Sequence, residues 1–239
     1  MQQIKLIWQD AENLSTAAAF YFVERCNRSI ADHGRFSVSL SGGSTPKRLY
    51  QLLATPPFAG NIDWKKVQLF WGDERFVPPA HEDSNYRMVK EALLDHIKIP
   101  RKNIFAMPTK GDAKDCAAQY EKTIEDALGK KTQIDLTLLG MGDDGHTSSL
   151  FPGTDVLNEK KRFIKEVWVE SKQTYRLSST YRLINNSKEV MFLVAGAAKA
   201  PVIKHIFSKN AKALYPVQGV DLKKGTVTWM LDKAATGLL

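Results

Sequence analysis

The sequence predicts an α/β fold: a doubly wound, mostly parallel sheet with helices on both faces. Short apolar segments of strand length alternate along the 239 residues with longer segments in which apolar residues recur at helical spacing. Residues 190–195 are apolar throughout, as expected of a central parallel strand that is covered on both faces. No linker, repeat or low-complexity segment divides the chain, so residues 1–239 are expected to form a single domain.

The first half of the chain contains four strand patterns with helices between them. Asp10 is placed to cap a helix that Gly34 ends, and Pro46 occupies a tolerated first-turn position of a helix that begins near Lys47. Asp83 or Ser84 is placed to cap the next helix. The strands are expected at 4–8, at an edge of the sheet, and at 36–40, 67–71 and 102–107.

The second half continues this alternation up to Gly153, after which two predicted strands follow each other with no helix between them. A helix at 112–128 is closed by Gly129, the segment 196–201 leads into a second helix that has Lys199 in its first turn and ends near Phe207, and Asp232 is placed to cap a short terminal helix at 232–235. Strands are expected at 134–139, 163–169, 175–177, 190–195 and 226–231.

Cysteine usage and hydropathy favour a cytoplasmic protein. Cys26 and Cys116 lie far apart within helical patterns, which suggests neither a disulfide framework nor a zinc site and fits a reducing compartment. The amino-terminal residues lack the basic and apolar regions of a leader, and no stretch approaches membrane-spanning length. No membrane partner is therefore expected.

The net charge of +8 is compatible with nucleic acid, with an anionic small substrate, or with solubility alone. The lysines and arginines are scattered, and no helix-turn-helix, zinc-finger or aromatic RNA-binding motif accompanies them. Nucleic acid is therefore not expected as a partner, and most of these charges are interpreted as solvated surface.

A glycine loop follows the strand at 36–40 and leads into a helix. In this loop, Ser41-Gly42-Gly43-Ser44-Thr45, backbone amides and the serine and threonine hydroxyls can converge on one anion. The loop lacks the Gly-Lys-Ser/Thr ending of a Walker loop and the Gly-x-Gly-x-x-Gly spacing of a dinucleotide fingerprint. It is either a phosphate site or a plain strand-to-helix turn.

Three further strand ends carry unusual polar residues. They are Asp73-Glu74-Arg75 after 67–71, Asp144-Gly145-His146 after 134–139, and Lys199 after 190–195. A lysine in the first turn of a helix suggests an anionic partner, because the helix dipole is already positive there.

Each of these strand ends alone could be solvated surface or a tight turn. At one sheet edge, however, together with the glycine loop they would form an anion cradle beside a histidine able to move a proton, which fits a sugar phosphate. No metal site is expected, because no second histidine or cysteine stands at ligand spacing from His146.

Several motifs together resemble the 6-phosphogluconolactonase family. They are Ser-Gly-Gly-Ser-Thr-Pro at 41–46, Trp-Gly-Asp-Glu-Arg at 71–75, Asp-Ser-Asn at 83–85, the run from Gly140 to Pro152, Gly-x-x-Lys-Ala at 196–200 and Trp-x-Leu-Asp-x-x-Ala-Ala at 229–235. The resemblance covers nearly the whole chain. It implies the doubly wound sheet shared with glucosamine-6-phosphate deaminase and ribose-5-phosphate isomerase. It also implies hydrolysis of 6-phosphogluconolactone to 6-phosphogluconate in the oxidative pentose phosphate pathway, without a cofactor.

The same resemblance implies roles for individual residues. His146 would be the general base that activates water, and Asp144 would orient it. The substrate phosphate would be held by Arg176, Lys199 and the loop residues Ser41, Gly42, Gly43, Ser44 and Thr45. Arg75 would be a further cation or, like the loop amides, a donor to the oxyanion, and Asp73 matches a carboxylate that is catalytic in the deaminase branch.

One departure from the family concerns Asp143, which stands where many relatives have proline or glutamate. Two adjacent aspartates are expected to raise the pKa of one of them, because their like charges repel.

Three rival functions fit the sequence less well. The nearest rival is the deaminase or isomerase, but the deaminase supplies a glutamate where this chain has Ser149-Leu150-Phe151-Pro152. A non-catalytic phosphosugar sensor would not need the pair of Asp144 and His146. A nucleic-acid-binding protein is supported by net charge alone. The expected partner is a small-molecule sugar phosphate lactone, and the expected assembly is a monomer or weak homo-oligomer.

Overall fold

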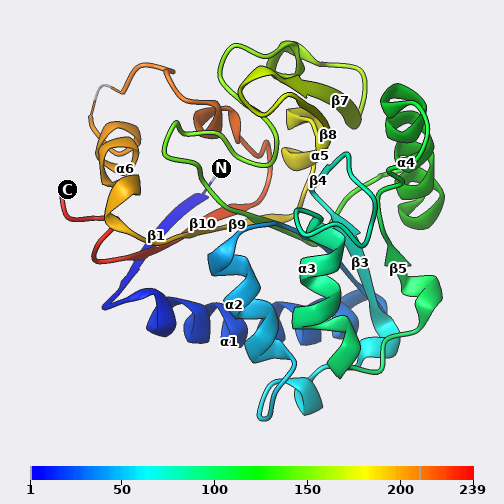
Figure 1. The fold of residues 1–239 in the computed structure, drawn as a ribbon. Helices are drawn as coiled ribbons and strands as arrows, with labels where there is room; N and C mark the ends of the chain where they lie inside the picture. Colours follow the sequence, from blue (N-terminus) through cyan, green and yellow to red (C-terminus); the bar gives the residue numbers. More distant parts are fainter. Residues whose placement is uncertain (1, 210) are drawn as a thin grey trace.

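The computed structural model describes residues 2–209 and 211–239, and its main feature is a parallel sheet of seven strands (Figure 1). Every neighbouring pair in this sheet is parallel. The strands lie in the order β1 (Gln2–Trp8), β10 (Thr226–Asp232), β9 (Glu189–Val194), β6 (Leu136–Leu139), β2 (Phe36–Leu40), β3 (Val67–Trp71) and β5 (Ile104–Phe105).

The chain changes direction across the sheet between β2 and β6. From β2 it adds β3 and β5 on one side, and it then returns to add β6, β9 and β10 on the other side. In open α/β sheets, the crevice at the carboxyl ends of the two strands that flank such a switch point is the usual place for a ligand. The loops that follow β2 and β6 therefore occupy the favoured position for a site.

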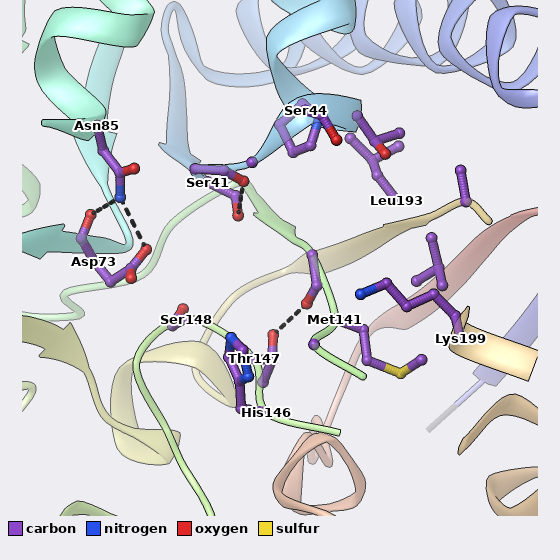
Figure 2. Close-up of a pocket in the computed structure, with 18 of the residues that line it drawn as sticks. Ser41, Ser44, Asp73, Asn85, Met141, His146, Thr147, Ser148, Leu193 and Lys199 are labelled. Carbon is purple, nitrogen blue, oxygen red and sulfur yellow. Dashed lines mark hydrogen bonds between the residues drawn. The ribbon is translucent and has the colours of Figure 1, made fainter. Parts of the chain in front are cut away.

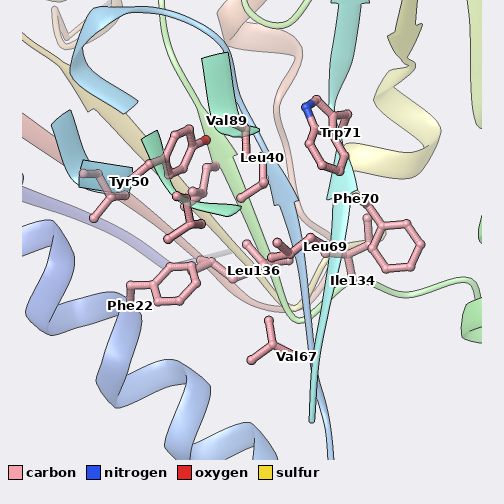
Figure 3. Packing of buried hydrophobic residues seen from close by; sticks show 14 of the residues in the cluster. Phe22, Leu40, Tyr50, Val67, Leu69, Phe70, Trp71, Val89, Ile134 and Leu136 are labelled. Atoms are coloured by element: carbon pink, nitrogen blue, oxygen red, sulfur yellow. The ribbon is translucent and has the colours of Figure 1, made fainter. Parts of the chain in front are cut away.

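Helices cover both faces of the sheet, as the sequence predicts (Figure 1). On one face, Phe22 and Tyr50 reach in from two helices to pack against residues of β2, β3 and β6 (Figure 3). On the other face, Val202 and Ile203 of α6 join a second apolar cluster with Phe192 of β9. The helices are α1 (Ala11–His33), α2 (Ser44–Leu53), α3 (Asn85–Ala92), α4 (Ala113–Leu128), α5 (Tyr181–Ile184) and α6 (Ala200–Ile206).

A small antiparallel sheet stands beside the carboxyl edge of the large one. It consists of β4 (Asp73–Arg75), β8 (Thr174–Ser179) and β7 (Ile164–Val169). β4 continues from β3 through Gly72, whose carbonyl accepts a hydrogen bond from the amide of Ser179 at 2.7 Å. The predicted strands at 163–169 and 175–177 thus pair with each other, but β4 was not predicted, because three charged residues carry no strand pattern.

The predicted helix ends agree with the structure at several residues. The Asp10 side chain accepts from the amide of Asn13, Ser84 accepts from Arg87, and Asp112 accepts from Lys114 and Asp115. Gly34 ends α1 with a φ of 82°, a left-handed conformation that favours glycine. Edge strand β1 and central strand β9 also lie where they were predicted.

Three predictions about element boundaries were wrong. α2 begins at Ser44 and not near Lys47, because Pro46 fits within its first turn. The strand predicted at 102–107 is reduced to β5, since residues 101–103 form a 3-10 turn. The terminal helix at 232–235 is absent: Asp232 ends β10 and accepts from the amide of Ala235, and turns follow it.

Both cysteines are buried and free, which agrees with the expectation that they form no disulfide. Among the residues that the structure describes, no helix is both long and apolar enough to cross a membrane.

Candidate active site

A pocket of about 270 Å³ opens at the carboxyl ends of β2 and β6 (Figure 2). Its walls come from the glycine loop, from the loop after β6, from β4 and β8 of the small sheet, and from Lys199. All of the predicted site residues line this pocket except Asp144, which lies behind His146 in contact with its ring. The topology therefore brings the predicted strand ends together.

His146 is presented to the pocket by a tight turn after β6. The amide of Gly142 donates to the carbonyl of His146 at 2.8 Å, and the amide of Gly145 donates to the carbonyl of Gly142 at 3.1 Å. Gly145 has a φ of 73°, which favours glycine. Asp144 Oδ1 accepts from the backbone amide of His146 at 3.1 Å and lies 2.6 Å from its Nδ1.

The contact with Asp144 fixes the protonation pattern of the imidazole. A carboxylate can only accept, so Nδ1 is assigned as the protonated nitrogen, which leaves the lone pair of neutral His146 on Nε2. Burial raises the pKa of Asp144, but the hydrogen bonds from the backbone and ring of His146 outweigh this effect and lower the pKa. The expectation that adjacent aspartates would raise a pKa was wrong for Asp144, whose closest partner is His146.

Two neighbours hold the His146 ring in place. The ring of Phe151 lies 4.2 Å from it, centroid to centroid, at an interplanar angle of 32°. A Cβ atom built on Gly142 would lie only 2.1 Å from Nδ1 of His146, so the ring occupies space that any other residue at 142 would fill. The side chain of His146 remains 29% exposed, on the pocket side.

The glycine loop is anchored at one end and open at the other. The hydroxyl of Tyr50 accepts from the amide of Ser41 at 2.9 Å and donates to the carbonyl of Ser41 at 2.8 Å. Within the described chain, the amides from Gly42 to Thr45 have no acceptor, and the last two belong to the first turn of α2. Open amides of this kind can bind an anion, whereas the amide of Ser41 is engaged by Tyr50 and its hydroxyl donates to the carbonyl of Gly42 at 3.2 Å.

Asp73 is held from two sides by residues for which no role was predicted. Its Oδ2 accepts from the hydroxyl of Ser149 at 2.7 Å, and its backbone carbonyl accepts from Nδ2 of Asn85 at 2.9 Å. A Cβ atom on Gly42 would lie 2.2 Å from Oδ1 of Asn85, so this glycine admits the asparagine beside the loop. Asn85 falls in the Asp-Ser-Asn motif, which was the sequence signal that could have identified it.

Glu74 serves the fold and not the pocket. Its carboxylate accepts from the amides of Arg75, Asn85 and Tyr86 at 2.7–2.8 Å and thereby holds the start of α3. Burial raises the pKa of Glu74, and these backbone hydrogen bonds oppose the rise.

Two arginines face each other across the antiparallel pair of β4 and β8. Arg75 and Arg176 are direct register partners, and their Nε atoms are buried without a hydrogen-bond partner in the described chain. Burial lowers the pKa of Arg176, and the positive charge of Arg75 adds to the effect, while Asp73 opposes it. Like charges placed opposite each other are unfavourable, and an anion in the pocket would relieve the repulsion.

Lys199 occupies the last position of a 3-10 turn (Ala197–Lys199) and caps α6, one residue before the helical position that was predicted. Its ammonium group donates to Oδ1 of Asp143. An anionic partner was predicted for this lysine, and the structure provides one within the chain itself.

The arrangement combines an oriented imidazole with open amides and cations, and this combination suits proton transfer on an anionic substrate. In residues 2–209 and 211–239, no group of three or more His, Cys, Asp or Glu side chains could hold a metal ion.

Fold and site together define a class: doubly wound α/β proteins with a pocket of open amides and cationic side chains at the switch point of the sheet. A family model described as glucosamine-6-phosphate isomerases/6-phosphogluconolactonase matches residues 9–229. The chain therefore belongs to the glucosamine-6-phosphate isomerase/6-phosphogluconolactonase family.

Individual relatives lie on the lactonase side of this family. A 6-phosphogluconolactonase from a Nostoc species is 42% identical over 218 residues, which are 88% of each chain. A 6-phosphogluconolactonase from Haemophilus influenzae is 40% identical over 84% of this chain and 87% of its own. The structure of a Trypanosoma cruzi 6-phosphogluconolactonase superposes with a TM-score of 0.89 at 29% identity, covering 100% of this chain and 98% of that one.

A monomeric glucosamine-6-phosphate deaminase shares the fold, with a TM-score of 0.82 at 20% identity and 100% of both chains covered. The comparisons confirm the predicted fold class, the resemblance to 6-phosphogluconolactonases and the prediction of an enzyme of the hydrolase class.

Proposed function

We propose that this chain hydrolyses 6-phospho-D-glucono-1,5-lactone to 6-phosphogluconate in the oxidative pentose phosphate pathway. One observation carries the proposal: Asp144 holds Nδ1 of His146 at 2.6 Å, while the ring lines a pocket that also contains open amides and two facing arginines. The first half of this arrangement suits a general base, and the second suits a phosphorylated substrate.

In the proposed reaction, Nε2 of His146 accepts a proton from a water molecule as the water oxygen attacks the lactone carbonyl. The resulting tetrahedral intermediate collapses by breaking the bond between the carbonyl carbon and the ring oxygen, and the imidazolium returns its proton to that oxygen. The product acid then loses a proton to solvent. Asp144 stabilises the imidazolium and keeps the ring oriented, as the carboxylate of a hydrolytic triad does.

The phosphate is assigned to the amides from Gly42 to Thr45 together with Arg176 and Lys199. Arg75 and the loop amides are the candidates for donating to the oxyanion, because they reach the same pocket as His146. Asp73 offers a carboxylate, fixed by Ser149 and Asn85, that can accept from a substrate hydroxyl.

The segment that supplies a glutamate in the deaminase branch distinguishes the proposed lactonase from a deaminase. After the histidine segment this chain has Ser149-Leu150-Phe151-Pro152, in which the buried hydroxyl of Ser149 donates to Asp73. No carboxylate stands there to assist opening of an amino sugar, and this favours the hydrolase.

The test follows freshly generated 6-phosphogluconolactone against its spontaneous decay. The proposal requires acceleration by the wild-type chain and loss of most of that acceleration in a folded His146→Ala variant. No acceleration above background would refute it and leave phosphosugar binding without turnover.

As part of this proposal, the chain acts as one domain, is a monomer or a weak homo-oligomer, and is located in the cytoplasm. The single domain is supported by the one central sheet that both apolar clusters cover, and the location by the two free cysteines.

A further inference from the structure

Lys199 differs from the other cations of the pocket in having its own counter-anion. Its ammonium group pairs with the carboxylate of Asp143, whereas neither Arg75 nor Arg176 has a carboxylate within ion-pair distance among the described residues. The Lys199 side chain is 23% exposed and lines the pocket, while that of Asp143 is 66% exposed and does not line it. The ion pair therefore spans the rim of the pocket.

The position of Asp143 in the chain links this ion pair to the base. Asp143 directly precedes Asp144, which orients His146, and the turn that carries all three residues closes from Gly142 to His146. Lys199 belongs to a different segment, the turn between β9 and α6. An anion bound at Lys199 would consequently compete with a residue of the loop that carries the base.

This competition matters for product release, because lactone hydrolysis increases the negative charge of the bound molecule. The reaction converts a neutral ester into a carboxylate and a proton, so the product carries one more negative charge than the substrate. A pocket lined by cations holds the product more strongly than the substrate on electrostatic grounds alone. An internal anion that can replace the product at one cation would oppose this retention.

We propose that Asp143 is an internal competitor for Lys199 that weakens the binding of anions in the pocket and thereby favours release of the product. This inference rests on the proposed function for the identity of the product, but the competition itself concerns any phosphate. The exchange is feasible because exposed ion pairs contribute only about 0–1 kcal/mol and are easily replaced. Asp143 thus acts on the bound anion only through Lys199, because it holds the ammonium group that the anion would otherwise contact.

The experiment titrates the intact protein with 6-phosphogluconate and, separately, with inorganic phosphate, and follows binding by calorimetry. Asp143→Asn should tighten the binding of both by about 2–5-fold at low salt, which is the value of one exposed ion pair. Asp143→Glu retains a carboxylate and should bind like the wild type. Asp155→Asn removes the same charge from an exposed residue outside this pocket and should also leave affinity unchanged.

A double-mutant cycle locates the effect at Lys199. In the background of Lys199→Met, which binds anions more weakly, Asp143→Asn should produce no further change. Equal tightening in both backgrounds would show a general field effect and would overturn the proposal, as would unchanged or weaker binding in Asp143→Asn alone.

Kinetics separate this inference from the proposed function. In Asp143→Asn, KM for the lactone and the inhibition constant of 6-phosphogluconate should both fall about 2–5-fold, the latter by the larger factor. If the wild type shows no lactonase activity but the phosphate titrations behave as described, the proposed function fails and the competition stands. If turnover is normal and the titrations show no competition, the reverse holds.

Discussion

Strand β6 has an aspartate and histidine pair at each of its ends, and the two pairs differ in what surrounds them. At the carboxyl end, Asp144 contacts His146 at the pocket. At the amino end, Oδ1 of Asp135 lies 3.0 Å from Nε2 of His33 and 2.7 Å from the ammonium group of Lys188. Oδ2 of Asp135 accepts from both the amide and the hydroxyl of Ser37 at 2.8 Å.

The difference shows how the same two residue types serve structure or chemistry. Asp135 is 4% exposed and joins the starts of β2, β6 and β9 to the end of α1, so its oxygens have no capacity left. Nε2 of His33 lies 3.0 Å from Oδ1 of Asp135 and 2.9 Å from the ammonium group of Lys188, and its protonation state decides which of the two it hydrogen-bonds. His146 instead contacts its aspartate through Nδ1, and the pocket-facing side of its ring has no partner in the described chain. An imidazole that is anchored through one nitrogen and lines a substrate-sized pocket with the rest of its ring, as His146 does and His33 does not, is suited to proton transfer.

The largest effect is expected when each histidine is replaced in turn by glutamine, which tests whether only His146 takes part in the reaction. His146→Gln should lower kcat/KM for lactone hydrolysis by about 10²–10⁴-fold, the usual contribution of a positioned general base. His33→Gln should leave kcat/KM close to that of the wild type. Steady-state assays of both variants, with circular dichroism as a check on folding, decide the matter, and a comparable loss in His33→Gln would contradict the division of roles.

The next largest effect is expected at the buried aspartate. Asp135→Ala leaves the buried amide and hydroxyl of Ser37 without their acceptor, which costs about 1–3 kcal/mol of stability, and it also removes the carboxylate that pairs with the exposed Lys188. Urea denaturation followed by circular dichroism measures this change. Activity per folded molecule should remain near that of the wild type, and a stability change below about 1 kcal/mol would show that the cluster is not structural.

Asp144→Asn should have a smaller effect than the loss of the base. The amide can still accept from Nδ1 but carries no charge to stabilise the imidazolium, so we expect kcat to fall by about 10–100-fold with KM little changed. A matched Asp155→Asn variant should retain full kcat. If KM rises and kcat does not fall, Asp144 belongs to substrate binding instead.

The smallest effect concerns pH and stability. The pKa of Asp144 is lowered from its ordinary value of 3.8 in the folded protein, so its ionised form favours folding. This contribution is fully present above the ordinary pKa and is lost as pH falls through the lowered one. The difference in unfolding free energy between the wild type and Asp144→Asn should therefore be largest at neutral pH and shrink below about pH 4. A difference that grows on acidification would contradict the sign of the shift.

The sequence predicted the site well where chemistry follows directly on a strand. Asp73 follows the apolar run 67–71 after one glycine, and His146 follows the turn after the apolar run 134–139. Parallel strands deliver their carboxyl ends to one edge, so the convergence of these residues on one pocket follows from the pattern alone. The open amides of the glycine loop were predicted for the same reason. The proposed roles of these residues, and a single domain at 1–239, stay predictions.

Other features depend on contacts that no local pattern contains. Tyr50 looks like an ordinary core residue of a helix, yet its hydroxyl engages the backbone of Ser41. Glu74 stands between two pocket residues but points to the start of α3. The partnership of Asp143 with Lys199 joins segments 56 residues apart, and only the packed structure brings them together.

The two glycines at the pocket, Gly42 and Gly142, have a consequence for how this sequence can vary. The space that a Cβ atom would need is filled by the side chain of Asn85 at Gly42 and by the ring of His146 at Gly142. Neither glycine can donate or accept a proton through a side chain, yet replacement of either would displace a residue that does. A mutational scan ranked by lost activity would accordingly place these two positions beside those proposed to be catalytic. The sequences open to this enzyme in evolution are limited by volume as strictly as by chemistry.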